Sequence, residues 1–500
     1  MTAPRREGSL ARLADAILLP PFPGHAAPRW ALHALERGLA GVTLFGPNVA
    51  TERQLAALTR SLRAAAAEPL LAIDEEGGDV TRLAHLTGSP YPGNAALGAV
   101  DDVHLTRAVY HALGRDLAGA GINLDLAPSV DVNTAAGNPV IGTRAFGDRT
   151  ALVSRHAAAA VTGLQSAGVA ACAKHFPGHG STREDTHRVL ATVEGGIEAV
   201  RSRDLPPFAA AIAAGVAAVM PGHLRVPGLT GGLAASQSAA ALTGLLRGEL
   251  GFTGVIISDA LEMRAVSRPD GIPAAAVRAA AAGVDLLCLG RDLAEEGYLA
   301  VRDAITAAVR DGGLPGERLA EAAARVAALR ASLAAGSLPG QGAAGQGPDA
   351  PRGREVGLAA ARRALRLTGT LPALTDPVVV EVEPAENIAA GRVPWGLGPW
   401  LPGGSVTRLA AAPGEAPASA LAAALAAAAG RSLIVVVRNA HRSAAAQALV
   451  SAVMSQRPDA VVVEMGLPVW QPPARAYLAT FGASRTCGQA AAELLGLAGY

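Results

Sequence analysis

Residues Ala171-Cys172-Ala173-Lys174-His175 form a short apolar run that ends in two polar side chains. Seven similar runs recur along the first two-thirds of the chain, each followed by a longer Ala-, Leu- and Arg-rich segment of helical character. Continuous apolar strands that alternate with helices are typical of buried parallel strands in βαβ units. The eight runs are residues 16–20, 41–46, 70–74, 123–128, 171–175, 217–221, 255–259 and 285–289.

Eight such units predict a (β/α)8 barrel of the TIM type, for which roughly 250 residues is usual. Five of the runs end in, or directly beside, a polar residue, and the active site of such a barrel forms at the carboxyl ends of its strands. A doubly wound open sheet is the main alternative, but it does not require polar groups at so many strand ends. The polar residues are Asp74, Lys174 with His175, His223, Asp259 and Arg291.

The last third of the chain predicts a second, smaller domain. Residues 336–353 are rich in Gly, Pro and Gln and indicate a linker or a surface excursion. Beyond them, helical and strand-like segments alternate again, which predicts an α/β sandwich with a parallel sheet. We therefore expect a barrel domain over 1–335 and a sandwich domain over 354–500. The expected helices are 354–367, 419–429 and 444–455, and the expected strands are 378–382, 433–437 and 460–463.

Composition excludes several classes of partner and location. Half of the 500 residues are hydrophobic, which is ample for a buried core, and the formal net charge is +1. No long basic run occurs, so we expect neither a nucleic acid nor a membrane as partner. Three scattered cysteines lack metal-ligand spacing and indicate core residues in a reducing compartment. The start of the chain lacks a signal-like apolar segment, and no run reaches the roughly 18 apolar residues of a membrane span. These features predict a cytoplasmic protein.

Lys174 is the only lysine, although the chain has 43 Lys and Arg residues together. An ammonium is a compact donor, whereas a guanidinium is a wide planar fork, so a crowded polar pocket can require the lysine. Asp185 and His187 follow on a loop, two residues apart. A carboxylate beside an imidazole fixes its tautomer and prepares it as a general acid. A metal site is the alternative, although the adjacent lysine disfavours a cation; its ligands would be His175, His179, Asp185 and His187.

Four other patches carry polar residues with both a functional and a structural interpretation. Asp74 begins Asp-Glu-Glu-Gly-Gly, which suits a ligand close to the backbone or an acidic turn. Arg144 lies in a long loop after the fourth strand, where it can grip a ligand or face solvent. His223 follows the sixth strand as a site or core histidine. Asp259 ends the seventh strand, either facing the barrel axis as a nucleophile or capping a helix.

Together these motifs resemble a known family. Lys-His-Phe-Pro-Gly-His-Gly at 174–180, followed by four residues and Asp-Thr-His, is similar to the signature of bacterial β-N-acetylglucosaminidases of glycoside hydrolase family 3. The stretches 73–78, 138–147 and 249–263 resemble that family's IDxEGG strand, arginine loop and nucleophile strand, in the same order. The resemblance covers about residues 10–335 and supports the barrel.

The resemblance assigns roles to individual residues. It implies that Asp259 is the nucleophile, His187 the acid/base, and Asp185 the partner that orients His187. It also implies a set of substrate-binding residues that hold sugar hydroxyls, namely Asp74, Arg82, Arg144, Lys174 and His175. His223, which falls at the end of another strand of the family, is included in this set. Asp79 departs from the family pattern, which usually carries Arg after the paired glycines, and Asp-Thr-His replaces the commoner Asp-Ser-His.

The implied activity is a retaining hydrolase that releases terminal β-linked N-acetylglucosamine from a small carbohydrate such as a muropeptide fragment. It would act as a monomer or homodimer, without metal or other cofactor. Histidine in place of the usual carboxyl acid/base removes a negative charge, so phosphate is an alternative acceptor and phosphorolysis an alternative reaction. Two further alternatives are an inactive sugar-binding protein and a glycosidase whose acid/base is Glu464 in the second domain.

Overall fold

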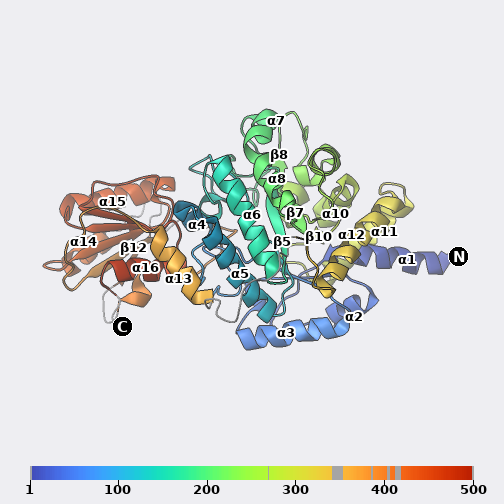
Figure 1. The fold of residues 1–500 in the computed structure, drawn as a ribbon, viewed down its shortest axis with the longest axis horizontal. Helices are drawn as coiled ribbons and strands as arrows, with labels where there is room; N and C mark the ends of the chain where they lie inside the picture. Colours follow the sequence, from blue (N-terminus) through green and yellow to red (C-terminus); the bar gives the residue numbers. More distant parts are fainter. Residues whose placement is uncertain are drawn as a thin grey trace. The chain divides into compact units, whose positions relative to one another are not determined.

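The computed structural model describes residues 3–268, 270–339, 353–383, 387–401, 406–410 and 418–497. Its chain packs into two compact units, which Figure 1 shows as ribbons. The first unit spans 1–75, 106–138 and 148–350, and the second spans 76–105, 139–147 and 351–500. Two loops of the expected barrel domain thus pack with the C-terminal segment. No helix in the described ranges is both long and apolar enough to cross a membrane.

The first unit is the expected (β/α)8 barrel. Six parallel strands pair in the order β2-β3-β4-β5-β7-β9, and β1 pairs with β10. Thr43 N donates to Pro20 O and joins β1 to β2, while a bridge between Ile257 and Leu286 joins β9 to β10, so the ring closes. All eight runs that the sequence indicated are therefore strands of the barrel. They are β1 (Leu18–Leu19), β2 (Gly41–Leu44), β3 (Leu70–Ile73), β4 (Leu124–Asp125), β5 (Ala170–Phe176), β7 (Ala218–Pro221), β9 (Val255–Ile256) and β10 (Leu287–Cys288).

Helices surround these strands, as the ribbon around β5, β7 and β10 shows (Figure 1). The longer ones are α1 (Ala3–Asp15), α2 (Arg29–Arg37), α3 (Glu52–Ala65), α5 (Val103–Gly119), α6 (Thr150–Ser166), α8 (Leu205–Ala213), α10 (Gly271–Ala282), α11 (Glu295–Arg310) and α12 (Gly316–Ala334). Short pieces complete the unit, namely α7 (Gly196–Ala199), α9 (Arg264–Ser267) and a two-stranded sheet of β6 (Ala191–Thr192) and β8 (Leu224–Arg225).

Alternate strand residues form the core of the barrel. Ala72, Cys172 and Ile257 belong to one buried cluster, to which α12 also contributes. Side chains two residues apart point to the same side of a strand. The residues two positions further along β3, β5 and β9 are Asp74, Lys174 and Asp259. This alternation places those three side chains above the core, at the carboxyl end of the barrel.

The second unit is a three-layer α/β sandwich. Its sheet has the order β11-β16-β15-β14-β12-β13, parallel except for β11, which pairs antiparallel with β16 at one edge. Successive strand residues face opposite layers: Val378 packs with α14 and α15, whereas Val379 packs with α13 and α16. The elements are α4 (Asn94–Val100), α13 (Gly353–Ala364), β11 (Arg366–Gly369), β12 (Val378–Glu383), β13 (Val406–Ala410), α14 (Ala418–Ala427), β14 (Leu433–Val437), α15 (Ala444–Gln456), β15 (Val461–Glu464), β16 (Ala476–Ala479) and α16 (Arg485–Leu494).

Two details of the C-terminal prediction need comment. The helix expected over 354–367 ends at Ala364, and its last two residues begin β11 instead. The linker expected over 336–353 falls mostly on 340–352, which lie outside the described residues. The expected domain limits therefore stay a prediction.

Candidate active site

Lys174 and Asp74 form an ion pair at the carboxyl end of the barrel. Lys174 Nζ lies 2.7 Å from Asp74 Oδ1. The lysine side chain is only 2% exposed, whereas that of Asp74 is 21% exposed. A compact ammonium suits this enclosed position, because a guanidinium needs a wider planar space. The only lysine of the chain thus holds a carboxylate that still faces solvent.

Asp131 organises the segment after β5. Its carboxylate is fully buried and lies 2.7 Å from His175 Nδ1. It also accepts from the backbone N–H groups of His175, at 3.3 Å, and of His179, at 2.6 Å. Burial acts to raise the pKa of Asp131. The His175 charge and these hydrogen bonds outweigh the effect of burial and lower the pKa to about 2. The ionised Asp131 therefore fixes the orientation of the His175 ring.

The Asp185–His187 pair has the geometry of a general acid/base with its orienting partner. Asp185 Oδ1 accepts from the backbone N–H of His187 at 2.9 Å and lies 2.7 Å from its Nδ1. Burial opposes ionisation, yet the hydrogen bonds from His187 outweigh it and hold the pKa of Asp185 below its usual range. With Nδ1–H donated to Asp185, Nε2 is the nitrogen left to exchange a proton. Both side chains remain 20–25% exposed, so a ligand can reach them.

His179 supports the loop that carries this pair. Its ring is buried, with Nδ1 lying 2.7 Å from Thr182 Oγ1 and Nε2 lying 3.2 Å from Thr186 Oγ1. Thr186 is the residue between Asp185 and His187. The threonine of Asp-Thr-His thus ties the dyad to the end of β5.

Asp259 is ionised at the end of β9. Burial acts to raise its pKa, but the nearby charges of His223 and His175 and the N–H of Ala260, which donates to Oδ1 at 2.8 Å, bring the pKa below its ordinary value. The helix-cap interpretation is wrong, because the next helix, α9, begins only at Arg264 and Met263 occupies its N-cap position.

His223 holds the segment that follows Asp259. Its Nε2 lies 3.0 Å from Ala260 O and its Nδ1 lies 2.7 Å from Ser236 Oγ. Burial lowers the pKa of His223, although the Asp259 charge acts in the opposite direction. Nε2 donates to the Ala260 carbonyl, and the Ser236 hydroxyl can either donate to Nδ1 or accept from it, so the ring satisfies both contacts whether it is neutral or protonated.

Arg144 and Arg82 lie in the second unit. Arg144 is buried and makes a bidentate pair with Glu76, from Nε to Oε2 at 2.9 Å and from Nη2 to Oε1 at 2.7 Å. Arg82 donates from Nη2 to Ala389 O at 2.9 Å. The sequence-based roles of both arginines toward a sugar stay predictions.

Comparison with known proteins decides the family. The family model described as "Glycosyl hydrolase family 3 N terminal domain" matches residues 30–329. The chain belongs to glycosyl hydrolase family 3. It is accordingly a glycosidase, and the resemblance inferred from the motifs is confirmed.

Individual relatives agree with this assignment. The chain is 34% identical over 324 residues to beta-hexosaminidase A of Pseudoalteromonas piscicida, a match that covers 59% of this chain and 54% of that protein. It is 42% identical over 241 residues to the beta-hexosaminidase of Xylella fastidiosa strain M23, covering 47% and 71%. A solved family 3 beta-N-acetylglucosaminidase from Paenibacillus sp. str. FPU-7 superposes with a TM-score of 0.85 at 33% identity, covering 98% and 97%. The barrel-plus-sandwich architecture is therefore shared over nearly the whole chain.

The alternative interpretations of this family 3 site can be compared with the geometry. Among the described residues, no three His, Cys, Asp or Glu side chains are grouped as metal ligands. The rings of His175 and His179 are committed instead to Asp131 and to two threonines. Glu464 is fully buried and accepts from the backbone N–H groups of Asn439, at 2.6 Å, and Ala440, at 3.1 Å. Burial raises the pKa of Glu464 to about 7. Its carboxylate thus holds a turn of the sandwich.

Two functional candidates were missed from the sequence, namely Asp131 and Glu76. Asp131 lies beside the histidine loop, and Glu76, which lay within the quoted acidic stretch, pairs with Arg144. His179 was considered only as a metal ligand, whereas its ring contacts Thr182 and Thr186. Asp131 lies a few residues after the end of a predicted strand, and this position was the only feature of the sequence that indicated a role in the site.

Proposed function

We propose that this family 3 enzyme is a retaining β-N-acetylglucosaminidase, with Asp259 as nucleophile and the His187–Asp185 dyad as acid/base. The observation that carries the proposal is the dyad geometry: Asp185 occupies His187 Nδ1 at 2.7 Å, which leaves Nε2 for proton transfer. The specificity comes from the relatives, whose names include beta-hexosaminidase and beta-N-acetylglucosaminidase.

The first half-reaction forms a covalent glycosyl–enzyme. The Asp259 carboxylate attacks the anomeric carbon while the glycosidic bond breaks, and His187 Nε2–H protonates the departing oxygen. Asp185 stabilises the imidazolium before transfer and fixes its tautomer, as the carboxylate does in other catalytic dyads. The lowered pKa of Asp259 keeps the nucleophile ionised at neutral pH.

The second half-reaction frees the sugar. Neutral His187 takes a proton from water, whose oxygen attacks the anomeric carbon, and the bond to Asp259 breaks. Free N-acetylglucosamine leaves and both side chains return to their starting states. The Asp74–Lys174 pair and His175 provide polar groups for sugar hydroxyls, and the family resemblance assigns the same role to Arg144 and Arg82.

We further propose a small carbohydrate as the substrate, a muropeptide fragment among them, handled in the cytoplasm by a monomer or homodimer. The reaction needs no metal or organic cofactor, because a carboxylate and an imidazole supply both the nucleophile and the proton. The barrel domain over 1–335 carries the chemistry in this scheme.

Phosphorolysis is the second candidate reaction. An imidazole at the acceptor side places no negative charge against an incoming anion, in contrast to the carboxylate of most retaining glycosidases. Phosphate could then attack the glycosyl–Asp259 intermediate in place of water and give a sugar 1-phosphate.

The deciding experiment measures release of 4-nitrophenol from 4-nitrophenyl β-N-acetylglucosaminide, with and without phosphate, and identifies the sugar product. We expect free N-acetylglucosamine at a rate that phosphate does not change. The His187→Ala variant should lose at least a hundredfold in kcat/KM, since general acid–base catalysis contributes about 10²–10⁴. His104→Ala, at the exposed start of α5, is the matched control and should retain full activity.

Two other outcomes of this experiment would support the alternative functions. A sugar 1-phosphate that increases with phosphate would establish the phosphorylase. Absence of nitrophenol release by wild type under both conditions would favour a sugar-binding protein without catalysis and would refute the proposed activity.

A further inference from the structure

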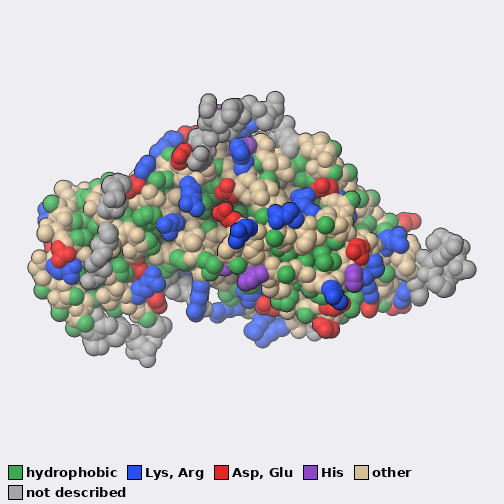
Figure 2. All heavy atoms as spheres, turned by 90° about the horizontal axis from the view of Figure 1, so that it is seen from below, with side chains coloured by type: hydrophobic (Ala, Val, Ile, Leu, Met, Phe, Trp, Pro, Cys, Tyr) green, Lys and Arg blue, Asp and Glu red, His purple; other side chains and the backbone are tan. Residues whose placement is uncertain are grey.

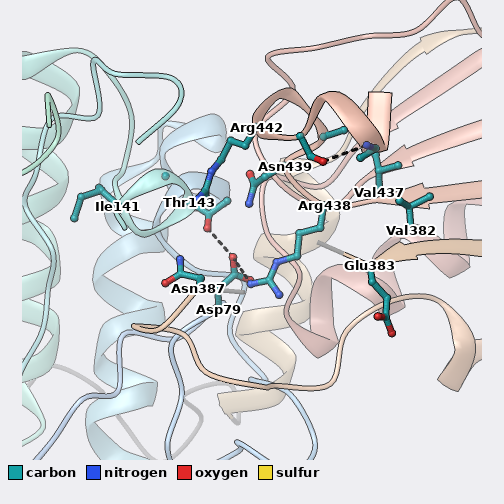
Figure 3. A pocket seen from close by; sticks show the side chains of 14 residues that line it. Asp79, Ile141, Thr143, Val382, Glu383, Asn387, Val437, Arg438, Asn439 and Arg442 are labelled. Carbon is teal, nitrogen blue, oxygen red and sulfur yellow. Dashed lines mark hydrogen bonds and ion pairs between the residues drawn. The ribbon is translucent and has the colours of Figure 1, made fainter. Parts of the chain in front are cut away.

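Asp79 marks the point where this chain departs from the family pattern of Arg after the paired glycines. Its side chain is 5% exposed and has three partners. Thr143 Oγ1 donates to Oδ2 at 2.6 Å, Arg438 Nη2 lies 3.1 Å from the same oxygen, and the backbone N–H of Ala483 donates to Oδ1 at 3.0 Å. Figure 3 shows Asp79 between the Thr143 hydroxyl and the Arg438 guanidinium. A buried carboxylate with this many donors is fully satisfied.

These contacts cross-link the two loops that carry the family's acidic and arginine motifs. Asp79 bonds Thr143, and three residues earlier Glu76 makes the bidentate pair with Arg144. Asn94 Nδ2 also donates to Arg144 O at 2.7 Å. The backbone and side chain of Arg144 are thus fixed from the 76–105 segment.

The C-terminal segment provides the anchors. Arg438 follows β14, and Ala483 follows β16, at the carboxyl ends of parallel strands of the sandwich sheet. The turn after Arg438 is held by the buried carboxylate of Glu464, described above. Arg442 Nη2 adds a bond to Pro139 O at 3.2 Å, on the arginine loop itself.

We propose that Asp79, anchored by Arg438 and Ala483, is a positioning residue for Arg144, so that the sandwich domain fixes the substrate arginine. The inference rests on the proposed function, in which Arg144 holds a sugar hydroxyl. An arginine on a long loop loses conformational entropy when it binds a ligand, and fixing the loop beforehand removes part of that cost. A contact made equally in the bound substrate and in the transition state affects KM more than kcat.

The Asp79–Arg438 ion pair differs from the exposed ion pairs on the surface of the protein. On the face in Figure 2, acidic and basic side chains are interspersed. Exposed pairs of that kind contribute little. The Asp79–Arg438 pair is instead enclosed, with 5% and 12% of the two side chains exposed, so loss of one partner leaves a buried charge. Replacing either partner should therefore release the loops that Asp79 joins.

The experiment compares Asp79→Asn and Arg438→Met with wild type. Methionine keeps the apolar stem of Arg438 while removing the charge. Glu493→Gln is the matched control, because Glu493 forms a bidentate pair with Arg362 in the same unit without touching either loop. We expect KM to rise about tenfold in both test variants, with kcat changed less than threefold and the control equal to wild type, a difference of about 1.4 kcal/mol in binding.

A double-mutant cycle tests whether Asp79 acts through Arg144. In an Arg144→Ala background, Asp79→Asn should add less than a twofold further rise in KM. A full tenfold addition in that background, or an unchanged KM in the single variants, would overturn the proposal.

Hydrogen exchange of peptides covering 139–147, without substrate, provides a readout independent of activity. Exchange should rise in Asp79→Asn and Arg438→Met and stay unchanged in Glu493→Gln, when each protein is measured well below its own thermal midpoint. Equal exchange in all four proteins would overturn the proposal. An inactive wild type with the expected exchange pattern would refute the proposed function while supporting the positioning network, so the two failures are distinguishable. If Asp79→Asn does not fold, Arg438→Met alone decides.

Discussion

Replacing Asp185 with Asn tests the dyad through a single oxygen-to-nitrogen change. Asp185 Oδ1 accepts two hydrogen bonds from His187, one from Nδ1 at 2.7 Å. When His187 is protonated, the Nδ1 bond is charge-assisted, and such bonds contribute about 1.5–3 kcal/mol. Both side chains are 20–25% exposed, so solvent screening favours the lower half of that range. About 2 kcal/mol corresponds to roughly a 30-fold loss in rate.

The assay compares kcat/KM for 4-nitrophenyl and 2,4-dinitrophenyl β-N-acetylglucosaminides. The dinitrophenolate leaves with little protonation, so bond cleavage with this substrate depends less on the acid. We expect Asp185→Asn to lose about 30-fold with the nitrophenyl substrate and less with the dinitrophenyl substrate. Asp459→Asn, a surface carboxylate paired with Arg457, is the control and should match wild type. A loss below threefold with both substrates, in a folded variant, would refute the reasoning about the dyad.

Three further predictions follow from other side chains. Lys174→Arg should lose at least tenfold in kcat/KM and lower the thermal midpoint, because forcing a larger group into a packed site costs about 1–3 kcal/mol; a fully active variant would contradict the compact-donor argument. The pKa of Asp131 is about 2 in the folded protein and lies below its unfolded value, so Asp131 stabilises the fold above about pH 5, by about 2–3 kcal/mol, and loses this as pH falls toward 2. The free energies of unfolding of wild type and Asp131→Asn, measured with urea, should therefore differ most near pH 6 and converge near pH 2. A difference that does not change with pH would contradict this role of the ionised Asp131. Glu464→Gln should keep kcat within threefold of wild type, because both carboxylate oxygens of Glu464 accept hydrogen bonds from a backbone turn. Loss of turnover in this variant would indicate that Glu464 in the sandwich domain is the acid/base.

The eight barrel strands could be predicted from sequence because each is a buried parallel strand and therefore a continuous apolar run. Two of the missed strands, β11 and β13, lack that pattern, whereas β16 (Ala476–Ala479) was missed although all four of its residues are buried. All four residues of β11 are exposed, and β13 mixes Thr and Arg with apolar residues at the opposite edge of the sheet. Edge strands face solvent and carry little hydrophobic signal. The expected helix extended to Leu367, beyond its observed end at Ala364, because the exposed residues of β11 give no strand pattern.

Site residues were found where a motif concentrated them and missed where they act through distant partners. Lys174, Asp185 and His187 lie within 14 residues of one another in sequence. Asp131 contacts His175 across 44 residues, and Asp79 contacts Ala483 across 404. No local spacing reports such pairs, since the fold alone brings them together. Asp79 was noticed only as a departure from the family pattern, and its partners became visible in the structure.

Covalent trapping shows directly which carboxylate forms the bond to the sugar. The enzyme is incubated with a fluorinated N-acetylglucosaminyl fluoride, which slows release of the sugar from the enzyme, and peptides are then mapped by mass spectrometry. We expect one sugar adduct, on the peptide that contains Asp259, and no adduct in Asp259→Asn. An adduct on a peptide that contains Glu464, or on any other peptide without Asp259, would exclude Asp259 as the nucleophile.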